Sequence, residues 1–372
     1  MKNGKTTPIC ERISTSNRVL RSALCLMLAW LIACVAGCAA SGGGVSKGTS
    51  ADTRFEDERI GDVAMPDNSQ SSGSAADAEG VASVPESSVA GESDARNEAD
   101  EGDRSSNREL VARLTAEAQT IADAAGMQVG ISVIDLGSNT YASAGGDAAI
   151  VSASMIKLPI AAAFLDSVSK GAYSLDDTYT LQYSDIVGGT GILAGYGAGA
   201  PITYRDLVID MISFSDNTAA NVLIRAIGME AVNEEARALG LTATQLNRFM
   251  MDTEAISSGV ENYTSSNDIA KLLKMIYEGT FVSPAASALV LQALEQQQDW
   301  GGILNGLPVG TVFAHKTGSL GNARHDGGIV EGSRPFVLVV LCGGEGFYEQ
   351  GALEVMRQEA ESAYAVLASS PA

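Results

Sequence analysis

The stretch Ala153-Ser-Met-Ile-Lys-Leu-Pro-Ile-Ala-Ala-Ala-Phe-Leu165 marks the point where the chain is expected to change from strands to helices. From Met155 onward every residue of this stretch is apolar except Lys157, which predicts a buried helix with one charge. Pro159 is tolerated only near the beginning of a helix, so Ser154 is expected to lie at or beside the helix N-terminus. The sequence therefore places a hydroxyl and a lone cation three residues apart on one helix face.

The elements on both sides of this stretch predict the fold class. Apolar periodicity predicts, in chain order, a helix at 107–126, strands at 129–135 and around 141, a mainly helical region from 154 to about 298, strands at 311–315, 326–330 and 336–341, and a helix at about 352–367. This order predicts an α+β fold, in which a five-stranded antiparallel sheet is flanked by the N- and C-terminal helices and carries an inserted all-α subdomain. The active site is expected in the cleft between the sheet and the inserted helices.

Residues 1–38 have the features of an export signal. Basic residues precede an uncharged apolar run from Ala23 to about Ala40. Small residues directly before a cysteine, in Val35-Ala-Gly-Cys38, favour a lipoprotein-type signal peptide with Cys38 lipidated and the protein anchored to the outer face of the bacterial cell membrane. The alternative is an uncleaved transmembrane anchor, because an 18-residue apolar run nearly spans a bilayer. Both alternatives place the rest of the chain outside the cytoplasm.

Residues 39–106 consist mainly of Ser, Gly, Ala, Asp and Glu. Such a segment cannot bury enough apolar surface to offset its ordering entropy, so a disordered acidic tether is expected before a folded domain at residues 107–372. The net charge of −21 leaves no basic stripe for phosphates, which excludes a nucleic-acid partner. Only Cys342 lies in the predicted domain, so no disulfide is expected there.

Three short motifs carry the chemistry, and each is weak when taken alone. Ser154-Met-Ile-Lys157 has a second copy at Ser167-Val-Ser-Lys170, but that copy lies at the C-terminal end of the predicted helix, where the helix dipole disfavours a developing negative charge. Ser215-Asp-Asn217 could be an ordinary helix cap, since all three residue types are favoured there. Lys316-Thr-Gly318 could be the end of a strand with a solvated lysine. The argument for a site depends on all three occurring in this order.

In that order the three motifs form the signature of class A β-lactamases and penicillin-binding proteins. The chain resembles this superfamily of serine hydrolases from about residue 107 to 370. The flanking sequences Ser215-Asp-Asn-Thr-Ala-Ala-Asn221 and His315-Lys-Thr-Gly-Ser319 are similar to class A sequence as well.

The resemblance implies a role for each motif residue. Ser154 would attack an amide carbonyl and form an acyl-enzyme, Lys157 would act as the general base or in the proton relay, and Ser215 would pass a proton to the departing nitrogen. The residues implied to bind substrate are Asn217, for a side-chain amide, and Lys316, Thr317 and Ser319, for a carboxylate. The expected partner is therefore a small-molecule β-lactam or a peptidoglycan peptide that carries a carboxylate, with no cofactor or metal, and we expect a monomer.

A Ser-His-Asp triad built on His325 and Asp326 is the weaker alternative. The two residues are adjacent at an expected strand start, so their side chains would point to opposite faces of the sheet.

One position departs from the class A pattern. In class A enzymes an Arg is followed two residues later by a Glu that activates the deacylating water, and then by an Asn. Here Arg248 is followed by Met250, and the Asn position holds Glu254. A thioether cannot accept a proton from water at neutral pH.

Three hypotheses follow from this departure. In the first, Asp252 or Glu254 supplies the deacylation base from a differently shaped loop, and the protein hydrolyses β-lactams or peptides; the alternative for these two carboxylates is a surface or helix-capping role. In the second, the protein is a D-Ala-D-Ala carboxypeptidase or transpeptidase that acts on peptidoglycan. In the third, it stays acylated and serves as a penicillin sensor or sink.

Overall fold

The computed structural model describes residues 93–370, which belong to one compact unit. The signal peptide and the lipidated Cys38 lie outside the described residues, as does the tether up to residue 92, and these stay predictions. Within the described part of the chain, none of the helices combines the length and apolar character needed to cross a membrane.

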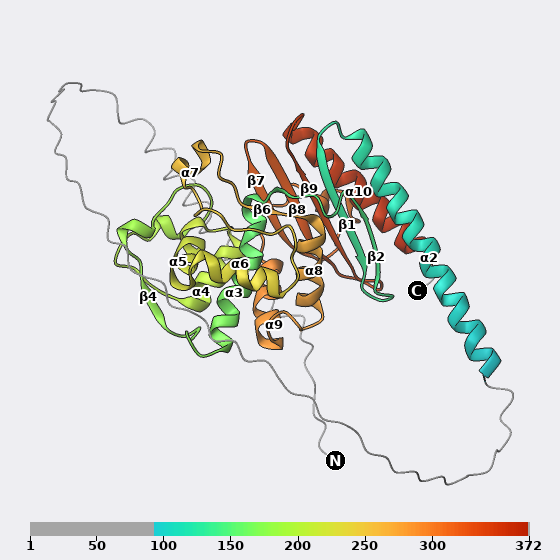
Figure 1. The fold of residues 1–372 in the computed structure, drawn as a ribbon, viewed down its shortest axis with the longest axis horizontal. Coiled ribbons are helices and arrows are strands. Elements are labelled where there is room, and N and C mark those ends of the chain that lie inside the picture. The colour runs from blue at the N-terminus through green and yellow to red at the C-terminus, as the bar shows by residue number, and fades with distance from the viewer. Residues whose placement is uncertain (1–92, 371–372) are drawn as a thin grey trace, which may run out of the picture. The chain divides into compact units, whose positions relative to one another are not determined.

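A five-stranded antiparallel sheet forms the centre of this unit (Figure 1). Its strands are, in chain order, β1 (Gln128–Asp135), β2 (Thr140–Ala144), β7 (Phe313–Leu320), β8 (Ala323–Val330) and β9 (Phe336–Gly343). They lie in the order β2-β1-β9-β8-β7, and each neighbouring pair is antiparallel. The predicted fold class is confirmed, and β7 lies at one edge of the sheet.

The two terminal helices cover one face of the sheet, α2 (Ser93–Ala124) and α10 (Glu349–Ser369). Leu110 and Leu114 of α2 pack there with Leu338 and Val340 of β9 in one apolar cluster. The helix predicted from residue 107 begins earlier, at Ser93. Residues 93–106 contain no proline and a single glycine, so nothing in this segment interrupts the helix strongly.

The other face of the sheet packs against the inserted helical subdomain. Val337, Val339 and Leu341 of β9 belong to the cluster on this side. Since β9 is buried on both faces, its sequence is a continuous apolar run rather than an alternating one. The subdomain contains α3 (Lys157–Ser169), α4 (Tyr204–Ser213), α5 (Asn217–Ile227), α6 (Met229–Ala238), α7 (Thr253–Ser257), α8 (Ser266–Tyr277) and α9 (Pro284–Glu295).

Short elements complete the connections. They are the two-residue pair β3 (Ile150–Val151) and β6 (Tyr263–Thr264), the pair β4 (Thr178–Thr180) and β5 (Pro201–Thr203), and the 3-10 turns η2 (Ala153–Ile156), η3 (Tyr183–Asp185), η4 (Leu193–Gly195) and η5 (Ile303–Gly306).

Among the strand bounds that differ from the prediction, two bear on the site. β7 continues through the Lys-Thr-Gly motif to Leu320, and β8 begins at Ala323 rather than at residue 326. Gly318 explains why the motif can lie in a strand beside η2. A Cβ added at Gly318 would lie 3.1 Å from the Ala153 side chain and 3.2 Å from the Ser154 backbone nitrogen, tighter than ordinary contact. The glycine therefore permits the close approach of β7 to the turn that holds Ser154.

Candidate active site

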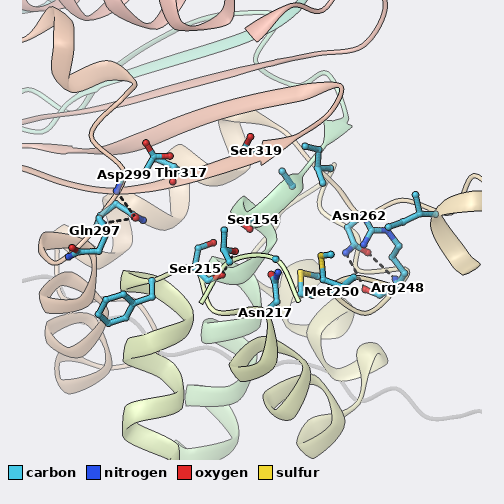
Figure 2. A pocket seen from close by; sticks show the side chains of 18 residues that line it. Ser154, Ser215, Asn217, Arg248, Met250, Asn262, Gln297, Asp299, Thr317 and Ser319 are labelled. Carbon is cyan, nitrogen blue, oxygen red and sulfur yellow. Dashed lines mark hydrogen bonds between the residues drawn. The ribbon is translucent and has the colours of Figure 1, made fainter. Parts of the chain in front are cut away.

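The three motifs meet at one cavity between β7 and the helical subdomain (Figure 2). Ser154 lies in η2 directly before α3, Ser215 lies in the loop before α5, and Lys316 lies in β7. Lys157 Nζ is 3.0 Å from Ser154 Oγ and 3.1 Å from Ser215 Oγ. Lys316 Nζ is 3.0 Å from the same Ser215 hydroxyl. The structure thus forms a continuous chain of polar atoms from Ser154 through Lys157 and Ser215 to Lys316.

Two backbone positions beside this chain are strained. Ala153 has φ +44° and Ser215 has φ +52°, in the left-handed region that residues with a Cβ rarely adopt. Such conformations persist only where the surrounding structure holds them, and they concentrate at functional sites. At this site they lie immediately before the expected nucleophile and at the expected proton carrier.

Lys157 is completely buried, and its environment favours the neutral amine. Burial lowers the pKa of Lys157 well below its usual value, and the positive charge of Lys316 lowers it further, while Asp216 acts in the opposite direction. Lys316 is also completely buried, and burial lowers its pKa to about 7 against the opposing charges of Asp326 and Asp299. The positive charge of Arg324 also lowers the pKa of Lys316.

The hydrogen bonds of Lys157 show where its lone pair would point. Nζ donates to the Ser215 carbonyl oxygen at 2.7 Å and to Asn217 Oδ1 at 2.8 Å. Both partners can only accept, so they use the two N–H groups of a neutral amine. The lone pair is then left to accept from a hydroxyl, and Ser154 Oγ is the nearer of the two within reach. This is the geometry that a general base needs toward its nucleophile.

Asp216 fixes the loop that carries Ser215. Its carboxylate accepts from the backbone N–H of Ala219, at the first turn of α5, at 2.9 Å. It also accepts from Ile192 and Leu193 at 2.6 and 2.8 Å, and so ties the 186–200 segment to the site. Gly191 is required for this contact, because a Cβ at that position would lie 2.2 Å from an Asp216 oxygen.

The cavity has a volume of about 340 Å³ and walls of two kinds. Thr317 and Ser319 of β7 line a polar wall, together with Asp299 from the segment after α9. The apolar residues that line the cavity include Phe214, Met250, Met251 and Ile256. Asn217 lines the cavity as well, and Lys157 and Lys316 join it through their hydrogen bonds to Ser215. The structure therefore brings together all seven catalytic and substrate-binding residues expected from the motifs.

Met250 occupies a fixed position in the cavity wall. Its backbone N–H donates to Asn221 Oδ1 at 2.8 Å, and its carbonyl oxygen accepts from Asn221 Nδ2 at 3.0 Å. Arg248 pairs with Glu261 at 2.5 Å and is almost completely buried, so its charge is used inside the loop. The loop is held on both sides of Met250, and the side chain it presents to the cavity has no basic atom.

The structure places neither Asp252 nor Glu254 in this cavity. Asp252 is the N-cap of α7, where its side chain accepts from the Ala255 N–H at 3.0 Å. Glu254 lies in the first turn of α7 and is exposed. Asp252 therefore has the capping role that was the alternative to a deacylation base.

Comparison with known proteins agrees with this geometry. A model of the beta-lactamase enzyme family matches residues 113–367. The chain belongs to this family.

Relatives within the beta-lactamase enzyme family are distant in sequence. A beta-lactamase of Rhodobacter capsulatus is 26% identical over 236 residues, which cover 62% of this chain and 80% of the relative. The extended-spectrum beta-lactamase PER-1 of Pseudomonas aeruginosa is 27% identical over 226 residues, covering 57% of this chain and 73% of the relative. Among solved structures, PBP-A has a TM-score of 0.63 at 26% identity, covering 69% of this chain and 96% of its own. A beta-lactamase from Sphaerobacter thermophilus has a TM-score of 0.62 at 28% identity, covering 70% and 99%.

The capping role of Asp252 leads to a prediction that separates stability from catalysis. Asp252→Ala is expected to lower the free energy of unfolding by about 1 kcal/mol, because α7 loses the acceptor for a free N–H. Asp252→Asn retains a capping acceptor and should cost much less. Denaturant unfolding checks both variants, and if an acyl-enzyme forms at Ser154, its lifetime should be the same in both as in the parent. A clear lengthening of that lifetime in Asp252→Asn would show instead that the carboxylate takes part in deacylation.

Two further site residues were not found from the sequence, Arg324 and Asp299. Arg324 lies opposite Ser319 in the register of β7 and β8, and its Nη2 is 2.8 Å from Asp299 Oδ2. The strand expected at 326–330 begins two residues after Arg324, so the sequence prediction did not place Arg324 in the sheet. A strand that included Arg324 would have placed its guanidinium beside the Lys-Thr-Gly motif.

The alternative triad is absent from the described structure. His325 and Asp326 point to opposite sides of β8, as expected. His325 Nε2 is 2.7 Å from the Val151 carbonyl oxygen, and burial lowers the pKa of His325 to about 4. Asp326 pairs with His315 Nδ1 at 2.8 Å. The Asp326 carboxylate and the His325 imidazole are therefore hydrogen-bonded to groups other than Ser154.

Proposed function

We propose that this protein is an exported serine hydrolase that is acylated at Ser154 by β-lactams or related cell-wall peptides and releases the acyl group slowly. The observation that carries the proposal is the buried Ser154–Lys157–Ser215–Lys316 chain beside a cavity whose wall holds Met250. The chain of polar groups would supply what is needed to form an acyl-enzyme. Met250 offers no base for its hydrolysis. A solved structure similar in fold and 26% identical, a mutant of PBP-A, is an acyl-enzyme complex with penicillin G.

Acylation would begin with neutral Lys157 taking the proton of Ser154 as Oγ attacks the amide carbonyl carbon. The developing negative charge on the carbonyl oxygen would be stabilised by the backbone N–H groups of Ser154 and Ser319, each worth about 3–4 kcal/mol of barrier. Lys157 then returns its proton through Ser215 Oγ to the amide nitrogen as the carbon–nitrogen bond breaks. Lys316 donates to the same Ser215 oxygen and favours this transfer, because it stabilises negative charge that develops on Oγ.

Deacylation would need a base that can remove a proton from a water molecule beside the ester. A general base supplies about a hundredfold to ten-thousandfold in rate. Met250 has none to offer, and the side chains of Asp252 and Glu254 do not line the cavity. The single carboxylate among the described lining residues, Asp299, is paired with Arg324. Slow release is therefore the expected behaviour. The export signal expected in residues 1–38 would place this activity at the cell surface, with lipidation at Cys38 part of the same proposal.

The test is a time course with a chromogenic cephalosporin, followed by optical absorbance and by intact-protein mass. A burst of one equivalent and an adduct that persists after the burst are expected. Ser154→Ala is the control and should show neither the burst nor the adduct. Sustained turnover would contradict slow release. The absence of any adduct, together with release of D-alanine from a cell-wall peptide, would instead support a carboxypeptidase.

A further inference from the structure

A negatively charged side chain lies at the end of the cavity where a substrate carboxylate is expected. Asp299 lines the cavity from the segment that follows α9, and Figure 2 shows it beside Thr317. Of the described residues that line this cavity, Asp299 is the single carboxylate. A class of substrate that must place its own carboxylate beside Thr317 would meet this charge.

Asp299 is held in place rather than free at the cavity mouth. Arg324 Nη2 is 2.9 Å from Oδ1 and 2.8 Å from Oδ2 of Asp299. The Gly301 backbone N–H donates to Oδ1 at 3.2 Å. Partial burial opposes ionisation, but hydrogen bonding and the charge of Arg324, with a further contribution from Thr317, lower the pKa of Asp299 below its usual value. The side chain is therefore a carboxylate at neutral pH.

The groups around Asp299 are the ones that would bind a substrate carboxylate. Ser319 and Arg324 face one another across β7 and β8, and Thr317 lies two residues from Ser319 on the same face of β7. The guanidinium on this face already pairs with Asp299. Lys316 has its pKa lowered to about 7, so it contributes only part of a positive charge at neutral pH. The positive charge that would attract an anionic substrate is thus largely neutralised from within the protein.

From these contacts we infer that Asp299 is a specificity-determining residue. It lies among the groups expected to bind a substrate carboxylate, and it selects for substrates whose group beside Thr317 is uncharged. The inference rests on the proposed acylation of Ser154 and narrows its substrate class. An incoming carboxylate must approach a fixed like charge and compete for Arg324, whereas an ester or amide at the same place can accept from Thr317 without that repulsion.

The test compares penicillin G with its methyl ester in the parent and in Asp299→Asn. The asparagine keeps an oxygen that accepts from Arg324, so the arginine retains a partner while the negative charge is removed. The second-order rate constant for acylation, measured by intact mass, is expected to rise about tenfold for the free acid and to change less than twofold for the ester. Asp176→Asn is the matched control. It removes the same charge from an aspartate that also pairs with an arginine, at 2.9 Å, on the exposed surface outside the cavity, and both rate constants should stay unchanged.

A second measurement separates this inference from the proposed acylation. In the Ser154→Ala variant no ester can form, so calorimetry measures the noncovalent binding of penicillin G without acylation. Adding Asp299→Asn is expected to tighten that binding about tenfold. No change, or weaker binding of the acid, would overturn the role of Asp299, and so would equal effects on acid and ester. If neither ligand acylates the parent or Asp299→Asn while circular dichroism shows both to be folded, the proposed function itself fails. Tighter binding of penicillin G after Asp299→Asn would, in that case, still support the role of Asp299 in selecting substrates.

Discussion

Lys157→Met is expected to slow acylation of Ser154 by about a thousandfold. The methionine has nearly the same length but no lone pair that can take the Ser154 proton, and general-base catalysis is typically worth a hundredfold to ten-thousandfold. Lys157 is completely buried, and a methionine of similar length fills the same space without a buried amine. The fold is therefore expected to tolerate the change, which a thermal unfolding curve would show.

The rate of adduct formation with a chromogenic cephalosporin measures this effect. The chain provides its own control in the second Ser-x-x-Lys copy. Lys170 is exposed and pairs with Asp166 at 2.5 Å. In the Lys170→Met variant, Ser154 should therefore be acylated at the parental rate. A parental rate in Lys157→Met, with the fold intact, would remove Lys157 from the mechanism.

The pH dependence of acylation follows from the same lysine. Burial and the charge of Lys316 lower the pKa of Lys157, so its neutral form is present well below the pH at which an exposed lysine loses its proton. Acylation by the parent should fall as the pH falls through that lowered pKa, because the protonated amine cannot accept from Ser154. Lys157→Met should lack this decrease, and an identical pH profile in both proteins would assign it to another group.

Met250→Glu is expected to shorten the lifetime of the acyl-enzyme by about a hundredfold. The backbone at Met250 is fixed by two hydrogen bonds to Asn221, and the side chain is already part of the cavity wall. A carboxylate introduced there would lie beside the cavity that contains Ser154 and could take the proton of a water molecule as it attacks the ester. Chromogenic substrate should then be turned over continuously after the burst.

Met250→Gln is the matched control, because it has the same length and polarity pattern as glutamate without a basic carboxylate. Its adduct should persist nearly as long as that of the parent. If Gln and Glu shortened the lifetime equally, access of water rather than a base would limit deacylation. If neither did, the attacking water would have to bind elsewhere in the cavity.

Much of the fold was predictable because the relevant signals are local. The apolar run of β9 and the helical spacing in α2 and α10 predicted the sheet and its terminal helices. Helix polarity favoured the first Ser-x-x-Lys copy over the second, and the structure buries Lys157 fully while Lys170 is largely exposed. The errors lie at element ends, where a short turn such as Gly321-Asn322 replaced the longer loop expected between β7 and β8.

For the site, too, some features follow from local sequence and others depend on contacts between distant parts of the chain. The residues that make up the site can be named from the sequence: a serine three residues before a lone lysine, the two companion motifs in order, and a methionine where a base was expected. How these groups behave depends on their neighbours in the folded protein. The neutral state favoured for Lys157 depends on Lys316, which is far away in the chain, and on complete burial, which no local pattern reports. The pairing of Arg324 with Asp299 likewise joins β8 to the segment after α9. A pKa and an ion pair depend on which charges lie within a few ångströms, and folding alone brings those charges together.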